Sequence, residues 1–433
     1  MVLFLSFITS AVIFFINVLI WKKLGYYLLG PFHMFNYFFV LYNWIGIFFV
    51  VIYKSSSFSL WDDFIYLKYW TIFNIGWLAL NLGGYFSYFF FKNFNSKNKI
   101  FSFFIVKSFS SHKTKLIKLI IIFIGLFLIL IIKYKFILLR LIANPTNYFE
   151  IRYNLHVSYI SYILSKSIIL LITSLISIYI VYSNIKINKK IFLLTFIFIL
   201  NIIASAITLQ KAPIANSILL FILLFYYRSI QKDRKINPFI FLKKFLSLVI
   251  VLSIVLIYFI KITSNSNLII ALEAYIKRLI LLGPFLNYEA ILFLDNKIHS
   301  LFLGGISFPT LFEIFNLPNI YLGKALYDYV FNRNIDVGTA NTCFFTAIYG
   351  DFGIIGSIVF LFLFGFLLYT IQLILIKDFK KNFHVSFAFF LTLSILSTKF
   401  NYTHLGTALL SEGFGVIFLL YLLLKFLISL SRS

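Results

Sequence analysis

The sequence predicts an all-α polytopic integral membrane protein with about 11 transmembrane helices, since a helix needs about 20 apolar residues to cross a bilayer. Of its 433 residues, 62% are hydrophobic and only 12% are charged. The mean hydropathy is +0.99. So little polar surface cannot cover a water-soluble globule of this length. Long apolar segments alternate instead with loops that are mostly short.

The apolar segments give the predicted helices in order. The first, residues 2–20, has no basic stretch before it and no small-residue cleavage site after it, which predicts a retained helix rather than a signal peptide. The other predicted spans are residues 28–52, 66–91, 116–133, 158–182, 191–208, 213–227, 245–261, 353–376, 383–398 and 405–427. Of these, residues 213–227 are the weakest prediction because the apolar run is short.

The basic residues predict the orientation of the chain in the membrane. When the loops are assigned alternately to two sides, one side holds roughly 23 Lys and Arg and two acids, Asp233 and Asp378, which identifies it as the cytoplasm. An odd number of spans then places the N-terminus outside and the C-terminus in the cytoplasm. The net charge of +25 therefore reflects topology, and we expect no nucleic-acid partner.

A long outer loop, residues 262–341, separates the spans of residues 1–261 from the C-terminal spans of residues 342–433. This loop is mildly acidic where the other loops are basic, and its apolar residues recur at helical spacing. We expect amphipathic helices that lie at the outer interface and cap the bundle. The single cysteine, Cys343, excludes an intramolecular disulfide. Without a Cys and His cluster of metal-ligand spacing, we expect no metal and no cofactor.

Residues 339–369, TANTCFFTAIYGDFGIIGSIVFLFLFGFLLY, place an Asn and an aromatic-rich stretch before a Tyr, Asp-Phe-Gly and a second Gly that opens a long apolar helix. This segment resembles the closing signature of the oligosaccharide repeat-unit polymerases, the Wzy-type O-antigen and capsule polymerases. Residues 148–163 are similar to the family's Arg-bearing outer loop, and residues 278–294 to the start of its large loop. Residues 207–227 are similar to its short basic turn, although many members carry Arg where this chain has Lys211.

The resemblance implies an outer-leaflet glycosyltransferase of the bacterial inner (cytoplasmic) membrane. Such an enzyme moves a growing glycan from undecaprenyl pyrophosphate onto an incoming lipid-linked repeat unit, without metal. The implied partners are undecaprenyl-pyrophosphate-linked glycans and the lipid bilayer, and a chain-length regulator is left open. The chemistry needs fixed cations at the pyrophosphate leaving group. It also needs a carboxylate or imidazole that accepts the proton of the attacking hydroxyl.

Cations are scarce on the predicted outer side, so each can be weighed individually. Arg152 could instead pair with Glu150, Lys211 could snorkel to lipid phosphates, and Arg278 could face anionic headgroups. Loop surface is the alternative for Arg333, and turn capping for Asn341. The candidates for pyrophosphate or glycan binding are Arg152, Lys211, Arg278, Arg333, Asn341 and Tyr349.

Three residues are candidates for the catalytic base: Glu289, His299 and Asp351. Asp351 opens a predicted span, and we favour helix capping as its role. The related outer-leaflet ligases use a His in the corresponding loop, which favours His299. The other acids of the loop are expected to be solvated or paired; they are Asp295, Glu313, Asp328 and Asp336.

Ionisable residues within the spans are few. Glu412 lies inside the last predicted span, where we expect it to be protonated or paired, with Lys399 or His404 as partner. Lys68 and Lys166 lie near the ends of spans, where we expect them to snorkel to the interface.

Two alternative functions remain beside the polymerase: an O-antigen ligase, and a lipid-linked oligosaccharide flippase or other transporter. A flippase should carry ionisable residues along a cavity within the spans and should have short loops. Here the spans are nearly free of charge and one outer loop is long, which favours the enzyme.

Overall fold

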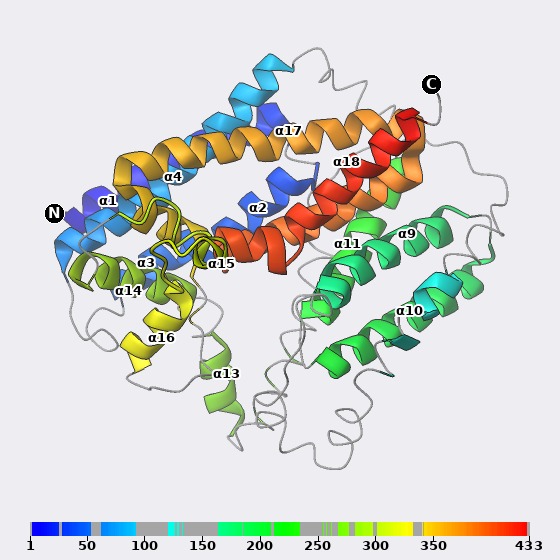
Figure 1. The fold of residues 1–433 in the computed structure, drawn as a ribbon, viewed down its shortest axis with the longest axis horizontal. Coiled ribbons are helices and arrows are strands. Elements are labelled where there is room, and N and C mark those ends of the chain that lie inside the picture. Colours follow the sequence, from blue (N-terminus) through cyan, green and yellow to red (C-terminus); the bar gives the residue numbers. More distant parts are fainter. Residues whose placement is uncertain are drawn as a thin grey trace. The chain divides into compact units, whose positions relative to one another are not determined.

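The structure is a computed structural model (Figure 1). It describes residues 2–25, 28–52, 62–91, 120–125, 128–129, 132, 163–183, 185–208, 212–233, 254, 257, 261, 267–276, 282–297, 301–331, 340 and 342–430. Within these ranges nearly every residue is helical and no strand occurs. The all-α class is therefore confirmed.

Three helical stretches of the described chain are long and apolar enough to cross a membrane: Leu5–Leu24, Phe344–Phe379 and Asn382–Asn401. Shorter apolar helices occur at Lys166–Tyr182, Ala215–Ile230 and Phe414–Leu427. The total of about 11 spans, which rests on about 20 apolar residues per span, stays a prediction.

The chain forms two compact units, each assembled from separate stretches of sequence. Unit 1 comprises Met1–Lys92, Ile236–Ile371 and Thr398–Thr407. Unit 2 comprises Asn93–Lys235, Gln372–Ser397 and Ala408–Ser433. The predicted division of the chain at residues 261 and 341 stays a prediction.

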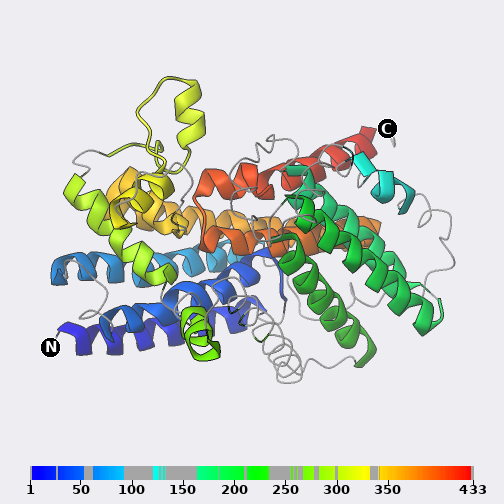
Figure 2. The ribbon, with the colours of Figure 1, turned by 90° about the horizontal axis from the view of Figure 1, so that it is seen from below.

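Unit 1 is built around two long apolar helices that pack along each other, α1 (Val2–Leu24) and α4 (Asp63–Phe90) (Figures 1 and 2). The other helical elements of this unit follow in chain order: α2 (Pro31–Phe39), η1 (Val40–Trp44), α3 (Ile45–Ile52), α13 (Leu268–Ile276), α14 (Leu282–Lys297), α15 (Pro309–Ile314), α16 (Leu322–Phe331), the first part of α17 (Phe344–Ser397) and η6 (Thr398–Asn401). Within it, α14 packs against α3, η1, α4 and α16. The predicted outer loop thus supplies helices that are part of a packed core.

Indole groups in this core donate to polar side chains on neighbouring helices. An unsatisfied N–H group is costly in apolar surroundings, so these bonds fix how the helices pair. The donor and acceptor pairs are Trp21 and Asn81 (2.7 Å), Trp77 and Asn36 (2.7 Å), Trp44 and Asn74 (3.2 Å), and Trp70 and Ser10 (2.8 Å).

Unit 2 contains η4 (Leu164–Ile168), α9 (Ile169–Tyr182), α10 (Ile187–Thr208), α11 (Ala212–Asp233), the last part of α17, η7 (Thr407–Ser411) and α18 (Phe414–Leu430). Helices α9, α10 and α11 lie side by side (Figures 1 and 2). The ring of Phe379 lies 5.4 Å from that of Phe390. Along a straight helix these residues would be roughly 16 Å apart. The chain therefore reverses between them, as expected from the predicted spans 353–376 and 383–398.

A buried ion pair joins the two π-helical segments of unit 2. The Lys166 ammonium in η4 lies 2.5 Å from a carboxylate oxygen of Glu412, which follows η7. The Ser167 hydroxyl donates to the Glu412 carbonyl at 2.9 Å. The prediction that Lys166 snorkels is wrong, because pairing with a buried carboxylate holds its ammonium inside the unit. Glu412 is paired, as expected, with a partner that the sequence did not indicate.

Candidate functional site

Helix α14 presents three consecutive polar residues to three different neighbours. Successive residues of an α-helix point about 100° apart, at 3.6 residues per turn. Asn287 accordingly contacts η1 and the start of α17, Tyr288 contacts the start of α4, and Glu289 lies near Tyr329 of α16. These three surroundings have different chemistry.

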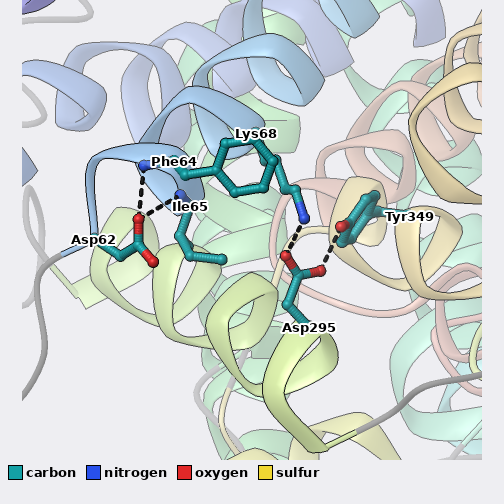
Figure 3. Close-up of polar contacts among 6 residues, drawn as sticks. All are labelled: Asp62, Phe64, Ile65, Lys68, Asp295 and Tyr349. Carbon is teal, nitrogen blue, oxygen red and sulfur yellow. Dashed lines mark hydrogen bonds and ion pairs between the residues drawn. The ribbon is translucent and has the colours of Figure 1, made fainter.

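On the α4 side, α14 is fastened by hydrogen bonds and an ion pair (Figure 3). Asp62 caps α4 by accepting from the backbone N–H of Phe64 at 2.7 Å and of Ile65 at 3.3 Å. The backbone N–H of Asp62 in turn donates to the Tyr288 hydroxyl at 3.0 Å. The start of α4 and the middle of α14 are therefore fixed to each other.

Asp295, two turns after Tyr288, lies between a lysine and a tyrosine. One of its carboxylate oxygens pairs with the Lys68 ammonium, and the other accepts from the Tyr349 hydroxyl at 2.5 Å (Figure 3). The Lys68 side chain stays partly exposed in this pair, so its snorkelling to the interface stays a prediction. Asp295 is paired, as expected. Both carboxylate oxygens of Asp295 therefore serve to hold α4 and α17 against α14.

Buried amide side chains connect α14 to the start of α17. Asn287 donates to the Asn43 side chain at 2.9 Å and accepts from the backbone N–H of Cys343 at 2.8 Å. Asn43 lies in the π-helix η1, and it donates to the Asn401 carbonyl at 3.3 Å. Single π-turns are frequent at functional sites, because they redirect a side chain that a regular helix would aim elsewhere. The network positions α14 from its core side.

Glu289 has a different environment from the other acids of α14. Its side chain is 3% exposed, and within the described part of the chain its Oε1 has no hydrogen-bond partner. Burial raises the pKa of Glu289 to about 7. A carboxyl group with a pKa near neutrality can both accept and return a proton, which is the property required of a general base.

Two aromatic rings lie on the same side of α14 as Glu289. Phe293 is one turn after Glu289, and its ring lies 5.3 Å from that of Tyr329 in α16. The Glu289 charge contributes to raising the pKa of Tyr329, after desolvation, which places the two side chains near each other. Both rings are partly exposed. We refer to Phe293 and Tyr329 as the aromatic pair.

Asp351 holds a loop segment rather than a helix end. Helix α17 begins at Phe344, so the predicted capping of its N-terminus by Asp351 is wrong. The two carboxylate oxygens accept from the backbone N–H of Ile306 at 2.9 Å and of Ser307 at 2.8 Å, and the Asp351 carbonyl accepts from Leu303 at 3.2 Å. We call these three bonds the Asp351 clamp. With both oxygens engaged, Asp351 is less suited to proton transfer than Glu289.

His404 is a candidate that the sequence did not indicate as a site residue. Its Nε2 accepts from the backbone N–H of Gly323, the second residue of α16, at 3.1 Å. The proton of the neutral ring therefore resides on Nδ1, which has no hydrogen-bond partner among the described residues. Burial lowers the pKa of His404 to about 4. His404 can thus donate a hydrogen bond at neutral pH without carrying charge.

The remaining predicted site residues lie outside the described residues, so their roles stay predictions. They are Arg152, Lys211, Arg278, His299, Arg333 and Asn341. Two other predicted candidates, Glu289 and Tyr349, are both connected with α14. Glu289 belongs to this helix, and Tyr349 contacts it through Asp295, which lies on a different face of the helix from Glu289. Neither the aromatic pair nor His404 carries a sequence motif that would have identified it.

No protein family, curated protein or solved structure matches this chain. In the described residues, no group of three or more His, Cys, Asp and Glu side chains could hold a metal ion.

Proposed function

We propose that this protein is an outer-leaflet glycosyltransferase that polymerises undecaprenyl-pyrophosphate-linked oligosaccharide repeat units, as an O-antigen or capsule polymerase. The observation that supports it is the buried Glu289 carboxylate, whose Oε1 has no partner in the described chain and whose pKa is raised to about 7. The resemblance of residues 339–369 to the closing signature of such polymerases supplies the reaction class.

In this proposal, Glu289 accepts the proton of the attacking sugar hydroxyl. The hydroxyl oxygen bonds to the anomeric carbon of the growing glycan, and the bond from that carbon to the pyrophosphate oxygen breaks. The lipid pyrophosphate leaves with the electron pair, and its charge needs nearby cations. The proposed cations that stabilise the pyrophosphate are Arg152, Lys211, Arg278 and Arg333.

The aromatic pair gives a reason for a sugar to bind beside Glu289. Sugar rings have apolar C–H faces that pack on aromatic side chains, and polar groups nearby then fix their orientation. Phe293 and Tyr329 would support the acceptor sugar while Glu289 meets one of its hydroxyl groups. Replacing either ring should raise the KM for the acceptor more than it lowers kcat.

The proposed cellular location is the bacterial inner membrane. Residues 262–341 and the N-terminus would lie outside, and the C-terminus would lie in the cytoplasm. An exposed lysine at the end of α14 and another in the first turn of α10 allow a test of this orientation. A membrane-impermeant maleimide applied to intact spheroplasts should label Lys297→Cys and spare Lys189→Cys. The reverse pattern would remove the outer-leaflet chemistry.

Gene deletion tests the function itself. A strain that lacks a polymerase should retain surface acceptors with a single repeat unit, whereas a ligase or flippase mutant should show no attached polysaccharide on a gel. Complementation with Glu289→Gln should leave single repeat units, and Glu273→Gln, an exposed acid of the same loop, should restore long chains. Complete absence of attached sugar in the deletion strain would favour the ligase or the flippase instead.

A further inference from the structure

Residues 301–317 form a compact loop segment with an unusually apolar surface. Between residues 301 and 321 the sequence holds a single charged residue, Glu313, whose carboxylate accepts from the Tyr321 hydroxyl. The most exposed apolar side chains of the segment are Leu303 (70%), Ile314 (70%) and Phe315 (66%). Such a patch would be costly in water and would be unusual on a soluble surface.

The backbone of this segment is fixed, so the exposed side chains do not simply fold inward. Phe308 donates to the Gly304 carbonyl at 2.8 Å, and Ile320 donates to the Gly305 carbonyl at 3.2 Å. A Cβ at Gly305 would lie 2.2 Å from the Pro318 carbonyl oxygen, so the close approach of these two parts of the segment requires glycine there. The Asp351 clamp attaches the whole segment to α17.

The clamp sets the segment beside an apolar ridge of α17. Exposed side chains recur at intervals of four residues along one face of this helix, within the candidate span Phe344–Phe379. They are Ile355, Val359, Leu363 and Leu367, and Ile355 is 80% exposed. Leu301 reaches within 3.9 Å of the Cβ position at Gly353, two residues before the ridge begins. The apolar surface therefore continues from the ridge onto the segment.

We propose that residues 301–317 insert into the membrane leaflet, with Leu303, Ile314 and Phe315 in contact with phospholipid acyl chains. The Asp351 clamp sets the depth of this insertion. Acyl chains are the occupant that fits, because the patch is continuous with the exposed ridge of a helix long enough to span a bilayer, and Glu313 is the single charged residue between residues 301 and 321. This role does not depend on the glycosyltransferase activity.

Fluorescence quenching in proteoliposomes tests the insertion with the full chain. A nitrobenzoxadiazole label is attached at Phe315→Cys or Leu303→Cys in a Cys343→Ala background, and the phosphatidylcholine carries bromine on its acyl chains. Both labels should lose most of their fluorescence to the brominated lipid and little to aqueous iodide. Ile355→Cys on the ridge is the control inside lipid, and Lys297→Cys on the exposed end of α14 is the control in water.

Further measurements test the location of the segment, the identity of the lipid and the role of the clamp separately. Iodide quenching at Phe315→Cys, with lipid quenching retained at Ile355→Cys, would show that the segment lies in water. Recovery of fluorescence at Phe315→Cys on adding a small fraction of unbrominated undecaprenyl phosphate would identify a polyprenyl chain, not phospholipid, as the occupant.

Asp351→Ala should weaken lipid quenching at Phe315→Cys and leave Ile355→Cys unchanged. Unchanged quenching at both positions would overturn the role of the clamp.

Discussion

At the scale of single residues, the two carboxylates Glu289 and Asp351 differ in their hydrogen bonds more than in their burial. Both are nearly inaccessible to solvent. Asp351 receives two backbone N–H groups, one on each carboxylate oxygen, whereas Oε1 of Glu289 has no partner in the described chain. The same kind of side chain therefore fastens a loop at one position and stays available for a proton at the other.

The raised pKa of Glu289 predicts how stability depends on pH. The folded chain binds a proton at Glu289 up to about pH 7, and the unfolded chain releases it near 4.5, so stability falls as pH rises through this interval. Glu289→Gln removes the titration. Relative to the wild type it should gain up to about 3 kcal/mol above pH 7 and nothing below about pH 4.5, since one pKa unit corresponds to about 1.4 kcal/mol.

Thermal unfolding of the detergent-solubilised protein at pH 4.5 and pH 8 measures this difference. Glu273→Gln, on the exposed surface of α13, is the matched control and should show no gain. A constant difference between Glu289→Gln and wild type at both pH values would mean that Glu289 has an ordinary pKa.

Asp351→Asn and Asp62→Asn should behave differently although the substitution is the same. Asp62 caps α4 through one oxygen, and Asn caps about as well as Asp, so its replacement should change stability by less than about 0.5 kcal/mol. Asp351 uses both oxygens, and an Asn there would turn an NH₂ group toward a buried N–H. We expect a loss of about 1–3 kcal/mol, measured as a lower unfolding midpoint. Equal effects at both positions would contradict the clamp.

At the scale of elements, α4 and α17 approach each other through a pair of glycines in unit 1. A Cβ at Gly83 would lie 1.9 Å from the Phe362 carbonyl oxygen, and a Cβ at Gly365 would lie 1.9 Å from that of Leu80. Small residues allow the backbones of membrane helices to come this close. Gly83→Ala or Gly365→Ala should each cost about 1–3 kcal/mol, because the helices must move apart.

Gly125 supplies the comparison for this prediction, since none of the neighbouring atoms in the described part of the chain lies within 4 Å of the Cβ that Gly125→Ala would add. The fraction of each variant that remains monodisperse in detergent after heating is the readout. Wild-type behaviour of Gly365→Ala would show that the two helices are not in backbone contact.

The Lys166 and Glu412 pair between η4 and the end of η7 should show strong coupling. Replacing one partner, as in Lys166→Met, leaves a buried charge without its partner and should cost about 3–5 kcal/mol. Replacing both, with Lys166→Met and Glu412→Leu, should recover most of that loss. A double-mutant cycle on unfolding midpoints decides this, and additive losses would mean that the two side chains do not interact.

The same elements show which parts of the fold could be predicted from sequence. Hydropathy predicts α1, α4 and α10 to within a few residues, because each of these helices coincides with one continuous apolar run of sequence. It placed the start of α17 at residue 353 instead of Phe344, because the first residues of that helix pack inside unit 1 and read as part of a loop. Hydropathy measures composition and does not distinguish the two environments.

The pairing of charges could not be predicted, for a different reason. Lys68 and Asp295 are separated by 227 residues, and Lys166 and Glu412 by 246. Nothing in the local sequence of a lysine near the end of a span distinguishes snorkelling from a buried partner on a distant helix. The sequence therefore predicts that both lysines snorkel, whereas Lys166 is paired in the interior of unit 2 and Lys68 is paired with Asp295 while partly exposed.

At the scale of the whole molecule, the candidate site depends on chain segments that are far apart in sequence. The sequence predicts Glu289 as a candidate from its place in the long loop, but the lack of a partner at its Oε1 within the described chain depends on how α14 packs against α4, η1 and α16. The contacts of the aromatic pair and of His404 likewise depend on how the helices pack. Sequence patterns led to a hypothesis about the chemistry, and the fold distinguishes one carboxylate from its neighbours.

Polymerisation by the purified protein tests the central claim most directly. The full chain in proteoliposomes is given undecaprenyl-pyrophosphate-linked repeat units and a chelator, and the glycan products are separated by length at pH 6 and pH 8. The wild type should form long chains, faster at pH 8 because Glu289 must be ionised, whereas Glu289→Gln should be about 10² to 10⁴ times slower at both pH values. Normal chain formation by Glu289→Gln would contradict the assigned base, and the absence of any polymer from the wild type would contradict the proposed function.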